Sequence, residues 1–250
     1  MDIFLAFFLG AIQGITEFLP ISSSGHLILF QKLFNITEGG MMFNIIVHVA
    51  TLFAVLLVFH KQVWDIIKNP FKPYSLLLIL ATFLTGIMFL LFKGLFEATF
   101  SGNFLGIAFL ATAVLLIASA MFQKQNNNPI KTKNAVIMGL AQGIAIIPGL
   151  SRSGTTICAG LLSGADKEKA AEFSFLMSIP IIVLSLFYEL YDGGFSVDSI
   201  GLLPIFVGFI SAFVFGLLSI KLLLALIKKQ NLAWFSLYLI PLGIVCLFLF

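Results

Sequence analysis

Charged residues are what this chain has least of. Only 10% of its 250 residues are charged, whereas 60% are hydrophobic and the mean hydropathy is +1.11. A soluble domain normally carries about 25% charged residues, so a soluble enzyme is a poor alternative. Most of the lysines lie between apolar runs and form no basic tract, so the charge gives no sign of nucleic acid as a partner. The composition predicts an integral membrane protein, with residues 1–250 as a single membrane domain surrounded by membrane lipids.

Cysteine and arginine are also scarce. Cys158 and Cys246 lie far apart in apolar stretches, so we expect two buried thiols rather than a disulfide. Arg152 is the only arginine in the chain. Because a charged side chain at membrane depth is costly and usually functional, Arg152 is the first candidate for a site.

The chain contains six apolar runs, each close to the ~20 residues that a spanning helix needs. The last three runs begin about 129 residues after the first three. The sequence therefore predicts two repeats, residues 1–121 and residues 130–250. The runs are Met41–Phe59, Tyr74–Phe92, Phe104–Phe122, Ala170–Tyr188, Leu202–Leu226 and Leu232–Phe250.

Before each set of three runs lies a segment that Pro, Gly and Ser interrupt, at residues 1–34 and 135–164. Broken segments are tolerated at membrane depth only where protein or water satisfies the backbone, so we predict two re-entrant helix–loop–helix hairpins. The hairpins share a motif whose matching residues are 129 positions apart. The pairs are Gln13 and Gln142, Gly14 and Gly143, Ser22 and Ser151, and Gly25 and Gly154.

Loop charge predicts how the repeats are oriented. Lysines occupy the loops after residue 59, around residue 130 and before residue 231, whereas the loop 189–199 carries three acids and no lysine. The positive-inside rule places the lysine-rich loops in the cytoplasm and both termini outside. With three spans per repeat the second repeat is inverted, and the hairpin tips meet within the membrane. The predicted fold class is an all-α integral membrane protein with an inverted-topology repeat, six spanning helices and two re-entrant helix-loop-helix hairpins.

The hairpin tips carry the residues that could do chemistry. Ser22 and Ser151 stand where helices would begin, and backbone amides at a helix start bind anions. Arg152 adds a planar fork of donors that suits phosphate. Glu17 and His26 add groups that can move protons. Together these residues favour a site that handles phosphate over a site for a neutral substrate.

Structural alternatives are open for the same residues. Arg152 could be a counter-ion that ties Glu17 to the other hairpin. His26 could be a core histidine whose hydrogen bonds are satisfied, and Gln13 and Gln142 could join the hairpins. The residues whose role the sequence leaves most open are Thr16, Ser24 and His48.

Two motifs resemble those of a known family. Gln13-x-x-x-Glu17 is followed by Pro20-Ile-Ser-Ser-Ser-Gly-His26, and the second hairpin carries Pro148-Gly-Leu-Ser-Arg-Ser-Gly-x-Thr156. Over essentially the full chain the sequence resembles the undecaprenyl-diphosphate phosphatase family, also called the bacitracin-resistance protein family. The resemblance implies a hydrolase of the bacterial plasma membrane that removes the terminal phosphate from a polyprenyl diphosphate lipid. Such an enzyme recycles the lipid carrier for peptidoglycan biosynthesis, and so acts in cell wall biogenesis, cell shape and bacitracin resistance.

The resemblance also implies roles for individual residues. The family has Glu or Gln at the position of Gln13, and an acid is expected in many relatives at the position of Asn44. A divalent cation such as Mg2+ or Ca2+ would therefore have Glu17 as its single nearby acid, and no organic cofactor is implied. The implied catalytic residues are Glu17, Ser23, His26 and Arg152, and the implied substrate-binding residues are Gln13, Ser22, Ser151, Ser153 and Thr156.

Two mechanisms and one other function stay open. In the first mechanism Ser23, or in second place Ser22, attacks phosphorus after His26 or Glu17 takes its proton. In the second mechanism water attacks, His26 is the acid or base, and Ser23 only binds phosphate. The other function is a transporter or flippase for an anionic prenyl-phosphate lipid, because inverted repeats with broken helices are typical of secondary transporters. The sequence leaves the oligomeric state open, and a homodimer is one of the alternatives.

Overall fold

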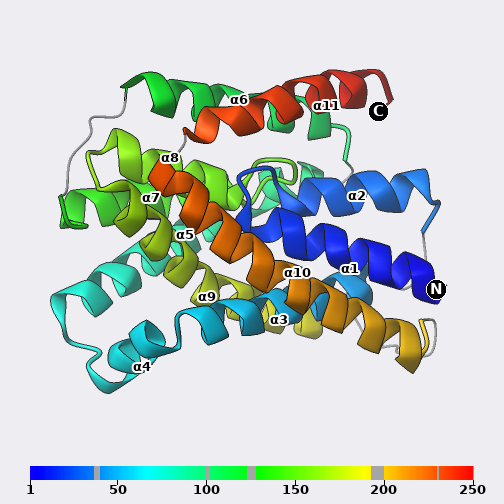
Figure 1. Cartoon of the computed structure of the whole chain (residues 1–250), viewed down its shortest axis with the longest axis horizontal. Coiled ribbons are helices and arrows are strands. Elements are labelled where there is room, and N and C mark those ends of the chain that lie inside the picture. Colours follow the sequence, from blue (N-terminus) through cyan, green and yellow to red (C-terminus); the bar gives the residue numbers. More distant parts are fainter. Residues whose placement is uncertain (37–39, 100–101, 123–127, 193–199, 230, 250) are drawn as a thin grey trace.

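The apolar runs of the sequence form long helices in the computed structural model (Figure 1). The structure describes residues 1–36, 40–99, 102–122, 128–192, 200–229 and 231–249, and these residues form helices joined by turns. In chain order the elements are α1 (Ile3–Phe18), α2 (Ser23–Leu33), α3 (Gly40–Val58), α4 (His60–Lys68), α5 (Pro73–Thr99), α6 (Leu105–Phe122), α7 (Thr132–Ile144), α8 (Arg152–Leu162), α9 (Lys167–Asp192), α10 (Leu202–Lys229), the 3-10 turn η1 (Leu232–Phe235) and α11 (Ser236–Leu249).

The long helices are suited to crossing a membrane. Five stretches, namely α5, α6, α9, α10 and η1 with α11, are long and apolar enough, and α3 with α4 makes a sixth if the bent pair counts as one span. Their outer faces expose large apolar side chains such as Phe83, Leu90 and Phe206 at 64%, 74% and 63%. Surfaces of this kind are a liability in water and are expected against lipid. The prediction of an all-α, multi-pass membrane protein is confirmed.

The segment after the first span differs from the prediction. We expected a basic loop there, but it contains the short helix α4, bent by 82° from α3. Trp64 and Ile67 are 59% and 64% exposed on α4, and Lys68 Nζ lies 4.9 Å from the centroid of the Trp64 ring. A helix with aromatic and apolar side chains beside lysines is typical of a membrane surface. Of the acidic loop predicted at 189–199, residues 193–199 lie outside the described residues.

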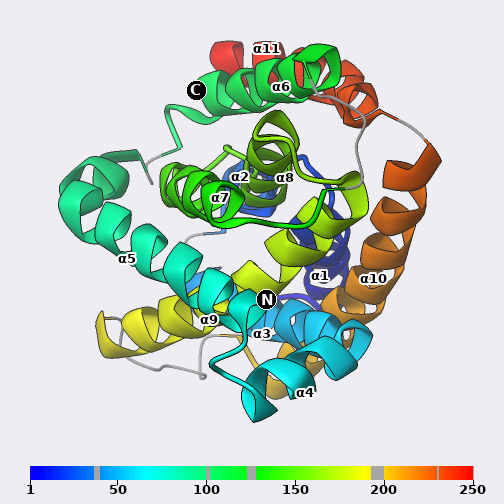
Figure 2. The ribbon, with the colours of Figure 1, turned by 90° about the vertical axis from the view of Figure 1, so that its left-hand side faces the viewer.

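The two broken segments form the predicted pairs of short helices. Pro20 follows Leu19, the residue that caps the end of α1, and the chain turns there into α2. The turn between α7 and α8 contains Pro148 and Gly149, and Gly149 has φ +91°. Figure 2 shows α7, α8, α2 and α1 in the middle of the molecule with the long helices around them. The hairpin tips therefore lie inside the helix bundle.

Each hairpin packs on a long helix of the other repeat. Helix α1 lies along α10, and α7 lies along α5. The contacts are close at glycine, because a Cβ atom on Gly10 would lie 2.4 Å from the Gly208 carbonyl oxygen and one on Gly139 would lie 2.6 Å from that of Ala81. This exchange of partners is what a duplicated chain would give. The repeat bounds 1–121 and 130–250 themselves stay a prediction.

The chain ends and the cysteines agree with the expectations from sequence. Both termini lie at the same end of the molecule (Figure 1), as the six predicted spans require, while the side of the membrane that they face stays a prediction. Cys158 and Cys246 are buried free thiols.

Candidate active site

Glu17, in the last turn of α1, joins the two hairpin tips. The residue is 6% exposed. Its Oε2 atom accepts hydrogen bonds from Gln13 Nε2 at 3.0 Å and from Ser23 Oγ at 2.5 Å. Its Oε1 atom forms an ion pair with Arg152 Nη2 from the second hairpin. One carboxylate therefore contacts a candidate nucleophile and the only arginine of the chain at once.

Helices α2 and α8 begin in the same way. Ser22 Oγ accepts from the Gly25 amide at 3.3 Å, and Ser151 Oγ accepts from the Gly154 amide at 3.0 Å. A serine before the first turn that accepts from the third helical amide is a standard N-cap. The residues that follow the caps, Ser23 and Arg152, are again 129 positions apart. The first helical position thus carries a hydroxyl in one repeat and a cation in the other.

Only one of the two terminal nitrogens of the Arg152 guanidinium has a partner among the described residues. Nη2 pairs with Glu17, whereas Nη1 is buried and has no hydrogen-bond partner among the described residues. A buried guanidinium nitrogen without a partner is costly. The amides of Arg152 and Ser153, in the first turn of α8, also have no partners within the helix. The counter-ion interpretation of Arg152 is therefore correct for one nitrogen and leaves the other free to bind an anion.

Ser22 has an unusual backbone conformation, with φ 72° and ψ 99°. Residues other than glycine rarely have positive φ, and each such position costs about 1–3 kcal/mol. Ser151, its counterpart, has a relaxed φ of −70°. The strain lies directly before Ser23, so the structure holds the chain there against its local preference.

A cavity of about 310 Å3 opens beside Glu17 and Arg152. One part of its wall is polar and the other part is apolar. The polar lining consists of Thr16, Glu17, Ser22, Ser23, Ser24, Asn44, His48, Gln142, Ser151, Arg152 and Ser185, and the apolar lining of Leu27, Ile28, Ala145, Ile146, Leu150, Ile181, Ile182 and Leu186.

Not all predicted site residues line this cavity. Ser153 Oγ donates to the Leu19 carbonyl at 3.1 Å and so ties the tip of the second hairpin to the first. Thr156 Oγ1 lies 2.5 Å from Ser174 Oγ on α9 and is fully buried. Both side chains hold the hairpins in place, and their predicted role in substrate binding has no support from the cavity.

Gln13 and Gln142 do not join the hairpins to each other in the described hydrogen bonds. Gln13 donates to Glu17 on its own helix, and Gln142 Nε2 donates to Thr85 Oγ1 on α5 at 3.2 Å. The Oε1 atom of each is buried and has no partner among the described residues. Gln142 lines the cavity, whereas Gln13 reaches it only through Glu17.

His26 also lies outside the cavity lining, although a spacing of three residues on a helix would allow its side chain to meet that of Ser23. The ring is 1% exposed and packs between Phe109 and Tyr238, with ring centroids 5.3 and 5.7 Å away. Nδ1 lies 2.7 Å from the Ser22 carbonyl oxygen, and Nε2 lies 2.7 Å from the Tyr238 hydroxyl. The described hydrogen bonds of His26 therefore reach neither Ser23 nor Glu17.

Two residues of α3 belong to the site instead. His48 Nε2 lies 3.8 Å from Glu17 Oε2, and Asn44 Oδ1 accepts from Gln31 Nε2 at 2.7 Å. Both line the cavity. The spacing of Asn44 and His48 by four residues, which puts them on one face of a helix, was a signal for this pair.

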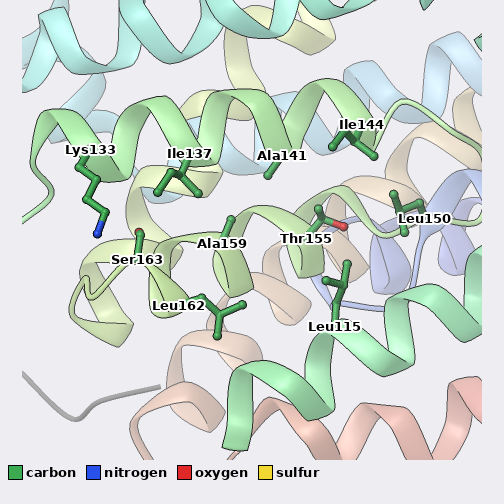
Figure 3. Close-up of a pocket in the computed structure, with 10 residues that line it drawn as sticks. All are labelled: Leu115, Lys133, Ile137, Ala141, Ile144, Leu150, Thr155, Ala159, Leu162 and Ser163. Atoms are coloured by element: carbon green, nitrogen blue, oxygen red, sulfur yellow. The ribbon is translucent and has the colours of Figure 1, made fainter. Parts of the chain in front are cut away.

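A second cavity of about 470 Å3 lies between α7 and α8. Figure 3 shows side chains of the two helices pointing toward each other across it, with Lys133 near one end and Leu150 near the other. Leu150 lines both cavities. The lining of the second cavity is apolar except for Lys133, Thr155 and Ser163, whereas the candidate catalytic residues Glu17, Ser23 and Arg152 line the first.

The fold and the first cavity together define a class: multi-pass membrane proteins with a buried polar centre where two helix–loop–helix hairpins meet. Within this class, the chain belongs to the family described as bacitracin resistance protein BacA, whose model matches residues 6–245. The family expected from the two motifs is confirmed.

Relatives named undecaprenyl-diphosphatase match along almost their whole length. One from Carboxydothermus hydrogenoformans is 41% identical over 255 residues, covering 100% of this chain and 98% of the relative. One from Treponema denticola is 43% identical, covering 98% and 96%. One from Bacteroides fragilis is 40% identical, covering 98% and 97%. This chain therefore matches these proteins from end to end.

Proposed function

We propose that this protein hydrolyses undecaprenyl diphosphate to undecaprenyl phosphate and inorganic phosphate. The observation that carries the proposal is the joint contact of Glu17 with Ser23 and Arg152 at the starts of two helices. The arrangement provides a nucleophile, a base and a cation for phosphate within one cavity. The names of the full-length relatives agree with it.

Arg152 and the helix starts bind the diphosphate in this proposal. The Nη1 atom of Arg152, which has no partner among the described residues, donates to a phosphate oxygen. Amides of the first turns of α2 and α8 point their positive dipole ends at the same group. Donors fixed before the reaction stabilise the charge that develops on the phosphoryl oxygens, which is usually the largest catalytic contribution.

Ser23 is the nucleophile in the proposed mechanism. Ser23 Oγ attacks the terminal phosphorus and passes its proton to Glu17, to which it already donates a hydrogen bond at 2.5 Å. The bond from phosphorus to the bridging oxygen breaks, undecaprenyl phosphate leaves with the electron pair, and Glu17 releases the proton to it. Water then attacks the phosphoserine and gives a proton to Glu17, Ser23 leaves as the hydroxyl by taking that proton, and inorganic phosphate is released.

The rival mechanism needs no covalent intermediate. Water attacks the terminal phosphorus directly, and Ser23 only donates a hydrogen bond to phosphate. The geometry favours the serine route, because Ser23 already contacts a base and His26, the acid or base of the rival, does not line the cavity.

The first units of the prenyl tail lie on the apolar wall of the same cavity. Leu27 and Ile28 of α2 face this space together with Ile181, Ile182 and Leu186 of α9. Burial of apolar surface is favourable at about 25 cal/mol per Å2. A substrate with one charged end and one apolar end therefore matches both parts of the lining.

The divalent cation that the resemblance implies beside Glu17 fits poorly with the side chains present there. Both Glu17 oxygens already accept hydrogen bonds, and the Arg152 guanidinium repels a cation. Among the described residues there is no group of three or more His, Cys, Asp or Glu that could hold a metal. No step of the mechanism uses one. Chelator added to the purified protein should change turnover by less than about twofold, because no group of the mechanism depends on a metal.

The cellular setting belongs to the proposal as well. We place the enzyme in the bacterial plasma membrane, where it recycles the lipid carrier for wall polymers and confers resistance to bacitracin. A homodimer stays a prediction that mass measurement in detergent would check.

Phosphate release by purified protein in detergent micelles tests the function. Micelles have no second compartment, so transport cannot give a signal there. We expect phosphate release from undecaprenyl diphosphate, and none from the Ser23→Ala variant. If wild-type protein released no phosphate yet moved prenyl phosphate across vesicle membranes, the transporter alternative would replace the enzyme.

A further inference from the structure

His26 is a buried group that the proposed mechanism does not use. Its ring lies between Phe109 of α6 and Tyr238 of α11, and it is not among the residues that line the cavity. Tyr238 stacks on the ring at an angle of 14°. Tyr238 comes from the second repeat and is 212 residues away in sequence. His26 therefore connects α11 to the first hairpin.

The donor and the acceptor in each hydrogen bond of the His26 ring can be assigned. A carbonyl oxygen can only accept, so Nδ1 carries the proton that is donated to the Ser22 carbonyl at 2.7 Å. In the neutral ring Nε2 then accepts from the Tyr238 hydroxyl at 2.7 Å. The His26 amide donates to the same Ser22 carbonyl at 3.3 Å. A continuous chain thus runs from Tyr238 through His26 to the backbone of Ser22.

The end of this chain is the strained residue. Ser22 has φ 72°, in the left-handed region that serine avoids. The next residue is Ser23, whose hydroxyl donates to Glu17. Two hydrogen bonds on the Ser22 carbonyl fix the orientation of the peptide between Ser22 and Ser23, and this peptide sets where the Ser23 side chain points.

We propose that Tyr238 and His26 are positioning residues, and that they hold Ser22 in its left-handed conformation so that Ser23 meets Glu17. The inference rests on the proposed function, because it assigns how the nucleophile of that reaction is oriented. His26 acts in it through the backbone and does not touch the substrate.

The repeat provides a natural comparison for Tyr238. Residue 129 positions before it is Phe109, which also contacts the His26 ring. The two counterparts enclose one histidine, and only Tyr238 carries a hydroxyl. The Tyr238→Phe substitution therefore gives position 238 the same side chain as its counterpart Phe109. It removes the hydrogen bond from the Tyr238 hydroxyl to His26 with little change in packing.

The test separates kcat from KM for phosphate release in micelles. Tyr238→Phe should lower kcat about fivefold to tenfold, the size expected for losing one hydrogen bond. His26→Ala should lower kcat about 100-fold, as a misplaced reacting group does. KM should change less than about twofold in both variants, because Arg152 and the helix starts are intact.

His26→Asn is the conservative variant, because its amide can still donate to the Ser22 carbonyl. It should recover much of the kcat lost in His26→Ala, and adding Tyr238→Phe to it should have no further effect. Tyr74→Phe, which removes a tyrosine hydroxyl from α5 away from the cavity, is the matched control and should leave kcat unchanged.

Three outcomes would overturn the proposal. His26→Asn as inactive as His26→Ala, with one limb of the pH profile of kcat lost, would make His26 a proton-transfer group. A parallel fall of kcat and thermal stability in Tyr238→Phe would leave only a structural role. If Tyr238→Phe had no effect on kcat, Tyr238 would have no part in positioning Ser23.

A readout without turnover keeps this inference separate from the proposed function. Nitrogen chemical shifts of isotope-labelled histidine report which ring nitrogen of His26 carries the proton. Wild-type protein should show Nδ1–H, and Tyr238→Phe should shift the Nε2 signal. If the protein released no phosphate but these shifts were found, the proposed function would fail while the hydrogen-bond chain stood; absence of Nδ1–H would overturn the chain itself.

Discussion

The two hairpins have the same local plan and different chemistry. Both begin their second helix with a serine cap, and the next residue is Ser23 in one and Arg152 in the other. Positive φ falls on Ser22 in the first hairpin and on Gly149 in the second, where it costs nothing. The first hairpin therefore stores strain beside Ser23, the proposed nucleophile, whereas the second is relaxed and supplies the positive charge. The two hairpins therefore supply different parts of one candidate site.

The largest effect should come from the first hairpin. Ser23→Ala removes the proposed nucleophile and should lower kcat by about 10^4-fold or more, as for other nucleophile deletions. Binding of the diphosphate should stay nearly normal, because Arg152 and the amides are unchanged. Single-turnover rates of the variant would measure the loss, and trapping of the phosphoserine in the wild-type protein would show the covalent intermediate. Turnover of a few per cent in Ser23→Ala would favour direct attack by water.

The charge of the second hairpin should come next. Arg152→Ala should lower kcat/KM by about 10^3-fold, in the range seen when an arginine that stabilises phosphoryl transfer is lost. Arg152→Lys should lose about 100-fold, because a lysine cannot donate from two nitrogens at once. Lys228→Ala, which breaks the exposed ion pair with Glu168, is the matched control for charge. Near-normal turnover in Arg152→Ala would eliminate the proposed site.

The hairpins should respond alike to a change in packing. Gly10→Ala and Gly139→Ala each place a Cβ atom within 2.6 Å of a carbonyl oxygen on the neighbouring long helix. Each should lower the free energy of unfolding by about 1–3 kcal/mol, as overpacking does. Gly86→Ala is the control, since nothing lies within 4 Å of the added atom. Denaturant titration in micelles would measure all three, and clearly unequal losses at Gly10 and Gly139 would contradict equivalent packing of the repeats.

The smallest effects are on the free energy of unfolding, and they should have opposite signs in the two hairpins. Ser22→Gly relieves the strain at φ 72° and loses only part of the cap, so the protein should gain stability by less than about 1 kcal/mol. Ser151→Gly has no strain to relieve and should lose about 0.5–1 kcal/mol. The same titration would detect the difference. Equal signs would mean that the Ser22 conformation is not strained.

Much of the architecture could be predicted from the sequence because lipid restricts the choices. Apolar runs of membrane length and segments broken by Pro20 and Pro148 have few alternatives in a bilayer. The contact of Glu17 with Arg152 followed from the same reasoning, since an isolated charge at depth needs a partner.

The orientation of individual side chains could not be predicted in this way. Ser23 and His26 are three residues apart, which on a helix allows them to meet. The His26 ring instead bonds back to Ser22 and to Tyr238, a partner more than 200 residues away that no local pattern reveals. The contact of His48 with Glu17 could not be predicted either, because the approach of α3 to the hairpin depends on packing across the whole chain.

The ion pair between Glu17 and Arg152 also has a consequence for biogenesis. An ionised side chain at the middle of a bilayer costs about 2.5–3.5 kcal/mol on insertion. Each hairpin, inserted alone, would carry one such charge, whereas the paired tips are neutral. Glu17 is synthesised 135 residues before Arg152, so the carboxylate of the first hairpin has no such partner until the second hairpin emerges. Pairing of the two charges therefore cannot precede synthesis of the second hairpin, whereas α9, α10 and α11 are made after it.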